Sequence, residues 1–201
     1  MELLIEYDYS SLVIDTLCKQ AVDESATVAC FYFDFATQEE QSTATILGSV
    51  LKQVIGGLNE IPQTIVKAFR ECKRVIGGQR LALAEIVKFL QDISSWQPTF
   101  ICIDALDECL ARPRAGLLDS LSKILQKSLA TRIFLTGRPH IRDEVKLHLA
   151  GKAATRSITP TKGDIVIFLQ AKLKEDTIPD AMDNCLQEKI IQIIPETVSE
   201  M

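Results

Sequence analysis

The amino-acid sequence predicts an α/β fold with a parallel sheet. Runs of β-branched and aromatic residues alternate with helical patterns of about ten residues or more, the length that a crossover between parallel strands requires. One of these runs, Thr99–Asp104, ends in an acid, and Asp107 and Glu108 follow within one turn of chain. Open α/β sheets present acids to a crevice in this way, at the carboxyl ends of their strands.

The first quarter of the chain predicts a helix, a strand and a second helix. Residues 10–17 carry a short helical pattern, and Thr27–Phe35 is a β-branched and aromatic run typical of a buried strand. Apolar residues then recur on one helical face over 46–54, and two glycines close that helix. Ahead of these elements, Leu3–Tyr7 either replaces the central first strand of the sheet or is irregular, in which case the sheet lacks its middle strand.

The remaining elements follow from the same periodicities. Helices are expected over 62–72, 83–93, 117–125 and 141–149, and further strands over Arg132–Thr136 and, at an edge of the sheet, Ala154–Thr159. From Thr161 the pattern is helical only, with a capping pair at Thr161 and Asp164 and a last helix from Met182 that stops at Pro195. We therefore expect an α/β core over 1–160 and the beginning of a helical domain over 161–201.

Composition narrows the class of protein. Of the 201 residues, 47% are hydrophobic and 24% charged, which excludes wholesale disorder. The net charge of -5 leaves no basic footprint, so we expect no nucleic-acid partner. The start of the sequence has no basic n-region, and no run reaches the roughly 18 apolar residues of a membrane span. The six cysteines are scattered without C-x-x-C spacing, so we expect core thiols in a cytoplasmic protein without membrane contact.

Three acids after a strand suggest metal-assisted chemistry. In nucleotide-hydrolysing α/β proteins, the acid at the end of the strand holds Mg²⁺ and a neighbouring acid orients or deprotonates the attacking water. Asp104 would be the magnesium acid, and Asp107 or Glu108 the water-activating one. The alternative is a solvated loop of acids after a core strand. The next predicted strand supports the first reading, because it would bring Arg138 to the same rim, where a guanidinium could contact a terminal phosphate.

Other polar residues give weaker signals. His140 and His148 have no Cys or His at ligand spacing beside them, so we expect no metal role for either. Three arginines are expected to be solvated or paired with surface acids such as Glu39 and Glu40: these are Arg112, Arg114 and Arg132.

Two motifs resemble those of a known family. The run Ile-Cys-Ile-Asp-Ala-Leu-Asp-Glu-Cys, followed by Phe-Leu-Thr-Gly-Arg-Pro, resembles the Walker B and sensor 1 motifs of NACHT domains, which are signal-transduction P-loop ATPases related to the AAA+ class. The similarity is greatest to the nephrocystin-like N-terminal modules common in fungal proteins with ankyrin or WD40 repeats. It extends over the helix at Ser10–Asp15, the strand at Val28–Phe35 and the transition at Ile158–Pro160.

The resemblance implies a P-loop-NTPase-like three-layer sandwich, truncated at its first strand and followed by the start of a helical domain. By family likeness, Asp104 serves Mg²⁺, Asp107 and Glu108 activate water, and Thr136 and Arg138 contact the nucleotide, with Arg138 sensing the γ-phosphate. Mg-ATP is the implied cofactor. The implied partners are other proteins or further copies of the module, in signal transduction.

The sequence departs from the family at the phosphate loop. A P-loop reads G-x-x-x-x-G-K-[ST], because backbone N–H groups wrap the phosphates while the lysine and the hydroxyl serve the phosphates and Mg²⁺. Here the first glycine is Gly48 and no lysine precedes Lys19. Asp8 would also place negative charge near the phosphates, at a cost of about 1 kcal/mol or more at about 4 Å. We therefore do not expect tight ATP binding.

Three functions remain open from the sequence. The first is a NACHT-type signalling or scaffold module with a degenerate or truncated NTPase core, more consistent with an inactive than an active enzyme. The second is a Mg-dependent ATP-binding switch that uses the Walker B acids and the sensor Arg138. The third is a fragment of a larger repeat protein without an independent function.

Overall fold

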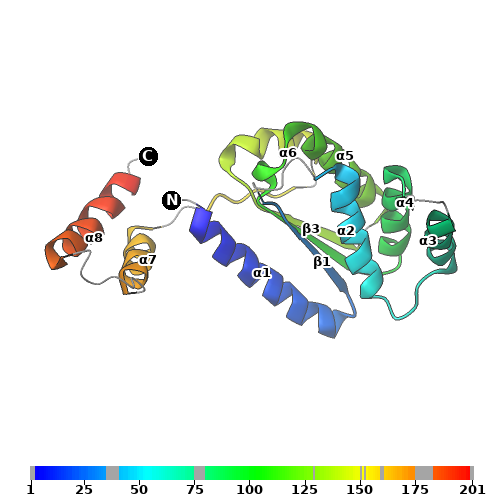
Figure 1. Ribbon diagram of the computed structural model, residues 1–201, viewed down its shortest axis with the longest axis horizontal. Coiled ribbons are helices and arrows are strands. Elements are labelled where there is room, and N and C mark those ends of the chain that lie inside the picture. Colours follow the sequence, from blue (N-terminus) through cyan, green and yellow to red (C-terminus); the bar gives the residue numbers. More distant parts are fainter. Residues whose placement is uncertain are drawn as a thin grey trace. The chain divides into compact units, whose positions relative to one another are not determined.

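The computed structural model describes residues 3–34, 41–74, 80–128, 130–149, 151, 153–158, 161–174 and 183–199. The chain divides into two compact units, Met1–Ala154 and Thr155–Met201, and each is described by itself. Figure 1 shows the sheet and most of the helices in the first unit. The boundary lies a few residues before Pro160, where the sequence pattern turns helical.

Three parallel strands form the sheet of the first unit. They are β1 (Thr27–Tyr32), β2 (Thr99–Asp104) and β3 (Thr131–Leu135), in the order β1-β2-β3. This sheet among helices confirms the predicted α/β class. Strand β1 is shorter than the sequence pattern predicts, because its pairing with β2 ends where Tyr32 meets Asp104. Phe35 lies outside the described residues.

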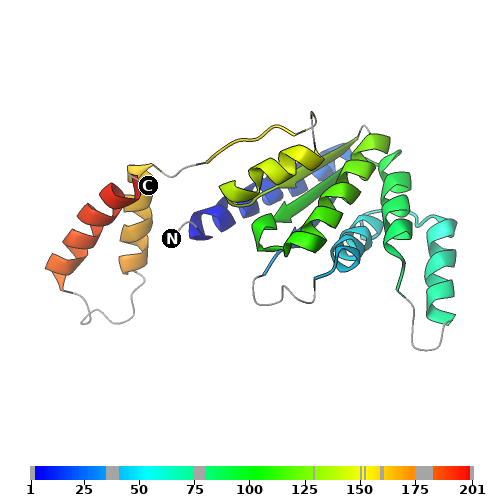
Figure 2. The same cartoon turned by 90° about the horizontal axis from the view of Figure 1, so that it is seen from above.

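Helices cover both faces of the sheet. Helix α1 (Leu3–Glu24) packs on β1 and β2 from one side, while α2 (Thr43–Gly56) and α5 (Ala111–Lys127) pack on the strands from the other (Figure 2). Helix α4 (Leu83–Ser94) packs on α2 and α5. The unit also contains α3 (Gln63–Arg74), α6 (Arg142–His148) and two short 3-10 helices, η2 (Leu106–Glu108) and η3 (Pro139–Ile141).

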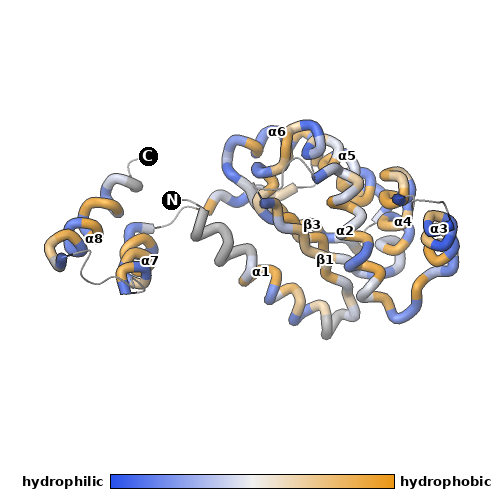
Figure 3. Tube along the Cα trace, viewed as in Figure 1, coloured by the Kyte–Doolittle hydropathy of each residue, from blue (hydrophilic) through white to orange (hydrophobic). Residues whose placement is uncertain are grey.

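The main hydrophobic core lies between the sheet and the layer of α2, α4 and α5. Alternate residues of β1 and β2 point into it, among them Ala29, Ile101 and Ile103, all 0% exposed. Helix α2 contributes Ile46, Leu47 and Val50 from its apolar face. The visible strands are hydrophobic along most of their length, as expected for a sheet covered on both faces (Figure 3).

The predictions for the N-terminal segment are wrong. Residues 3–24 form the single helix α1, so Leu3–Tyr7 is neither a strand nor irregular, and the helix predicted at 10–17 is only its middle. The physical reason is visible in the sequence. No glycine or proline occurs before Gly48, so nothing interrupts the helix until the polar residues at its end, where Ser25 takes a positive φ of 52°.

The second unit contains α7 (Lys162–Lys174) and α8 (Asn184–Ser199). The edge strand predicted for Ala154–Thr159 is wrong over 154–158, which has no regular secondary structure, and Thr159 lies outside the described residues. A strand needs a neighbouring strand to complete its backbone hydrogen bonds, and the residue pattern of a single segment does not show whether such a neighbour exists. Helix α8 continues through Pro195 instead of stopping there, and Met182 is likewise outside the described residues. None of the described helices is long and apolar enough to cross a bilayer.

Candidate functional site

The predicted acids and the predicted sensor residues come together at the carboxyl ends of β2 and β3. Asp104, the last residue of β2, is 3% exposed, and its Oδ1 accepts a hydrogen bond of 2.5 Å from the Thr136 hydroxyl. The same Thr136 oxygen accepts a hydrogen bond from the Ala105 backbone N–H at 3.0 Å. Thr136 therefore connects the side chain of the acid to the backbone that follows it.

The backbone turns sharply directly after Asp104. Ala105 has φ 53° and ψ 45°, the left-handed region that non-glycine residues rarely occupy. This conformation costs roughly 1–2 kcal/mol in an L-residue. Two backbone hydrogen bonds help to hold the turn, because Leu106 donates to the Thr136 carbonyl at 2.9 Å and Thr136 donates to the Ile103 carbonyl at 3.0 Å. Strain held in place by surrounding contacts is common at functional sites.

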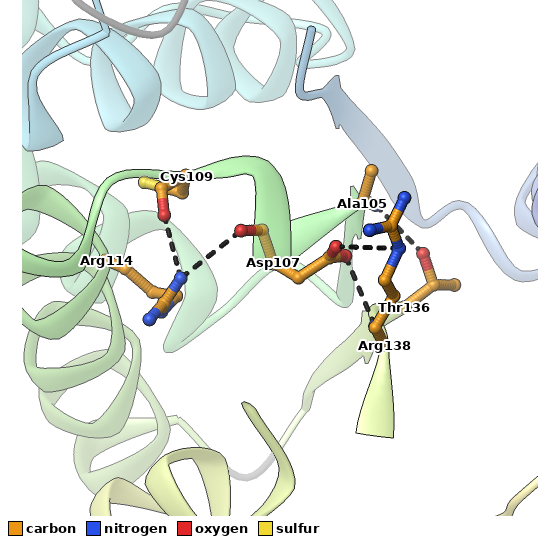
Figure 4. Close-up of polar contacts among 6 residues, drawn as sticks. All are labelled: Ala105, Asp107, Cys109, Arg114, Thr136 and Arg138. Carbon is orange, nitrogen blue, oxygen red and sulfur yellow. Dashed lines mark hydrogen bonds and ion pairs between the residues drawn. The ribbon is translucent and has the colours of Figure 1, made fainter. Parts of the chain in front are cut away.

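Asp107 holds the loop after β3. Its Oδ1 accepts a hydrogen bond from the Arg138 backbone N–H at 3.2 Å, and its Oδ2 lies 3.4 Å from Arg138 Nε (Figure 4). The Asp107 side chain is 5% exposed and the Arg138 side chain 40% exposed. Gly137 allows this close approach, since a Cβ there would lie 3.3 Å from Asp107 Oδ1 and 2.7 Å from Ile141 Cδ1.

Sequence reasoning missed Arg114, which the structure places in the same network. Its Nη1 donates to the Cys109 carbonyl at 2.8 Å and to the Asp107 carbonyl at 3.4 Å (Figure 4). Its Nε lies 2.9 Å from Oε2 of Glu144 on α6. The side chain is 13% exposed, so Arg114 is not solvated, whereas the predicted pairing with an acid is found, with Glu144, whose side chain is 27% exposed. Burial raises the pKa of the neighbouring Cys109 thiol to about 11, against an opposing effect of Arg114.

No sequence signal singled out Arg114, because its partners are backbone carbonyls and an acid from another helix. Its position in the first turn of α5, facing the turn that carries the acids, becomes visible only when the two segments fold together. We refer to Asp104, Asp107, Arg114, Thr136 and Arg138 together as the polar junction.

The other predicted residues lie at or beyond the margin of the polar junction. Glu108, in η2, is partly buried and has interaction partners of its own. His140 is exposed, and His148 Nδ1 lies 2.7 Å from Asp119 Oδ1 on α5. Over the described part of the chain, no group of three His, Cys, Asp or Glu side chains gathers that could hold a metal ion by itself. A cation at Asp104 would therefore need water or ligand oxygens to complete its coordination.

The geometry defines the class of the protein first. It is an α/β protein with a parallel sheet. At the carboxyl ends of two neighbouring strands, β2 supplies the acid Asp104, and the segment directly after β3 supplies the hydroxyl of Thr136 and the guanidinium of Arg138. The family model described as Nephrocystin 3, N-terminal, matches residues 9–138, well over half of the chain. The chain belongs to this nephrocystin 3 N-terminal family. A search of curated proteins and a search of solved structures each give no match.

Proposed function

We propose that the chain is a NACHT-type signalling or scaffold module in which the nucleotide site serves as a structural connection and does not turn over ATP. The observation that carries the proposal is the contact between Asp107 and Arg138. Asp107, the acid expected to activate water, contacts Arg138, the arginine expected to sense a phosphate. Its Oδ1 accepts a hydrogen bond from the Arg138 backbone N–H at 3.2 Å, and its Oδ2 lies 3.4 Å from Arg138 Nε. The Asp107 carboxylate and Arg138 Nε are therefore directed at each other.

Mg-ATP is the cofactor that the family resemblance suggests, and the residues fit it only in part. Asp104 and Thr136 offer oxygens of the kind that Mg²⁺ accepts, directly or through water. The 201-residue sequence has no G-x-x-x-x-G-K-[ST] motif to bind the phosphates, and the residues that would follow such a loop are part of the continuous helix α1. Within these 201 residues no loop is present to bind the phosphates, and we derive no catalytic step through Mg-ATP.

A thermal-unfolding experiment separates this proposal from the ATP-dependent switch. A ligand present at about 100 times its Kd stabilises the native state by about 2.7 kcal/mol, which is several degrees in Tm for a domain of this size. We expect no rise in Tm with millimolar Mg-ATP, and hydrolysis of ATP at the background rate. The matched variant is Asp104→Asn, which removes the charge that would hold Mg²⁺ while it keeps an oxygen that accepts from Thr136.

Two results would contradict the proposal. The first is a rise in Tm with Mg-ATP, absent without Mg²⁺ and absent in Asp104→Asn. The second is ATP hydrolysis above background that Asp104→Asn abolishes. Either result would support the switch instead, with Asp104 holding Mg²⁺ for a bound nucleotide.

A scaffold acts through protein contacts, and the second unit offers apolar side chains for them. Ile167 on α7 and Ile193 on α8 are 68% and 56% exposed. Light scattering after size exclusion, over a range of concentrations, tests self-association of the full chain. We expect Ile167→Glu to lower the average mass at high concentration if copies of the chain associate through this unit, and a monomer at all concentrations would leave other proteins as the partners.

A further inference from the structure

The face of the sheet that α1 covers carries two cysteines directly opposite each other. Cys30 on β1 and Cys102 on β2 are register partners in the parallel ladder. Neighbouring strands lie about 4.7–4.9 Å apart, and the side chains of register partners point to the same face. A disulfide spans Cα separations of about 4.4–6.8 Å, and the usual spacing of paired strands falls inside that range. The two thiols are also in hydrogen-bond contact with each other.

The surroundings of the pair favour oxidation over a purely structural role. Cys102 is 1% exposed, while Cys30 is only partly buried and is accessible to a small oxidant. A hydrogen bond from the Cys102 thiol lowers the pKa of the Cys30 thiol, and partial burial opposes the effect. The thiolate is the nucleophilic form of cysteine, so Cys30 is the thiol that reacts first. Two thiols are too few for a structural zinc site, which takes four protein ligands.

We propose that Cys30 and Cys102 form a peroxide-sensitive thiol pair that closes to a disulfide between β1 and β2. The Cys30 thiolate attacks one oxygen of hydrogen peroxide, giving a sulfenic acid and releasing hydroxide. Cys102 then loses its proton and attacks the Cys30 sulfur as the thiolate. The S–S bond forms, the S–O bond breaks, and the departing hydroxide takes up that proton and leaves as water. Overall, two thiols lose two electrons and two protons, and one peroxide is reduced to two waters.

The position of the bond relates it to the polar junction. In register, Cys30 and Cys102 lie two residues before Tyr32 and Asp104. A disulfide between Cys30 and Cys102 would fix the separation of β1 and β2 three residues before the turn at Ala105. The proposal does not depend on the function proposed above, because thiol oxidation is measured without nucleotide or partner.

The test is peptide mapping of the native full-length chain. The reduced protein is treated with a small excess of hydrogen peroxide, blocked with N-ethylmaleimide, digested without reductant and analysed by mass spectrometry. We expect a peptide pair joined through Cys30 and Cys102, lighter by about 2 Da than the two thiol peptides together, which reductant separates. The number of free thiols falls from six to four.

Variants show whether the pairing depends on the strand geometry. Cys30→Ser and Cys102→Ala each remove the linked peptide, whereas Cys72→Ser, which changes a partly buried cysteine on α3, leaves it unchanged. Cys18→Ser also leaves it unchanged, although Cys18 on α1 lies close enough to Cys30 to interact with it. Protein unfolded in urea serves as a reference, since an unfolded chain pairs its thiols without this preference. This reference keeps the test decisive even if a variant folds poorly.

Three outcomes would overturn the proposal. The first is a link between Cys18 and Cys30 in place of the link to Cys102. The second is a sulfinic acid at Cys30 with Cys102 still free. The third is survival of all six thiols in the folded protein under conditions that oxidise the urea-unfolded chain.

Discussion

The hydrophobic core and the polar junction hold the same sheet by different means. On the core side, Ala29, Ile101 and Ile103 are fully buried against helices, and their contribution is proportional to the apolar area removed from water. At the carboxyl ends of β2 and β3, two buried carboxylates, a hydroxyl and two guanidinium groups fix the loops through directed contacts. The core tolerates changes of shape that conserve volume, whereas the junction loses stability whenever a buried polar group loses its partner.

The comparison also shows how the acids of the polar junction can be required for structure alone. Buried polar groups must be satisfied, and in the polar junction most of the partners come from the chain itself. Asp104 and Asp107 can then be required for folding even where no nucleotide binds. Four substitutions test this comparison, from the largest expected effect to the smallest.

Ile101→Ala is expected to cost the most. The side chain is 0% exposed in the middle of β2, and truncation of a buried isoleucine costs about 3 kcal/mol of unfolding free energy through lost transfer energy and a cavity. Urea unfolding followed by the fluorescence of Trp96, the only tryptophan, measures this in the first unit. The control is Ile101→Val, which should cost about 1 kcal/mol. If Ile101→Ala loses less unfolding free energy than Thr136→Val or Arg114→Ala, the polar junction contributes more to stability than the core does.

Thr136→Val keeps the shape of the side chain and removes its hydroxyl. The buried Asp104 then loses its hydrogen-bond donor and the Ala105 N–H loses its acceptor, so we expect a loss of about 2 kcal/mol in the same unfolding measurement. Thr136→Ser keeps the hydroxyl and should retain most of the stability. Equal losses in the two variants would mean that the methyl group, and not the hydroxyl, stabilises the junction.

Arg114→Ala tests the arginine that the sequence did not single out. It leaves the Cys109 carbonyl and the Glu144 carboxylate without this partner, and we expect a loss somewhat under that of Thr136→Val, about 1.5–2 kcal/mol. Arg112, two residues earlier on α5, is exposed, so Arg112→Ala should stay within about 0.5 kcal/mol of the wild type. If the two variants lose similar amounts of unfolding free energy, Arg114 does not stabilise the polar junction.

Gly137→Ala should have the smallest effect of the four. The added methyl group would lie 2.7 Å from Ile141 Cδ1, and Ile141 is 5% exposed with limited room to move. We expect a loss of about 1 kcal/mol from overpacking. Gly56→Ala, where nothing lies within 4 Å of the added atom, should be close to neutral. If Gly137→Ala is neutral as well, the loop after β3 adjusts and the contact of Asp107 with Arg138 is not held by close packing.

Much of the first unit could be predicted from the sequence because its signals are local. The periodicity of residues 46–54 and 83–93 predicted α2 and α4, and the β-branched run at Thr99 predicted β2 to the residue. The helix α1 was misjudged because a short apolar run such as Leu3–Ile5 fits a strand as well as a helix. The predicted edge strand failed for a related reason, since pairing depends on a neighbour that local sequence does not specify.

The sequence by itself determined the α/β class, the acids at the end of β2 and the resemblance that the family match supports. These depend on residue types and spacings along a single stretch of chain. Only the tertiary structure decided that Asp107 binds Arg138, that Arg114 bridges the turn and α6, and that Cys30 faces Cys102. Each of these pairs joins segments that are distant in sequence or separated by a turn, and such contacts are set by strand register and helix packing rather than by local pattern.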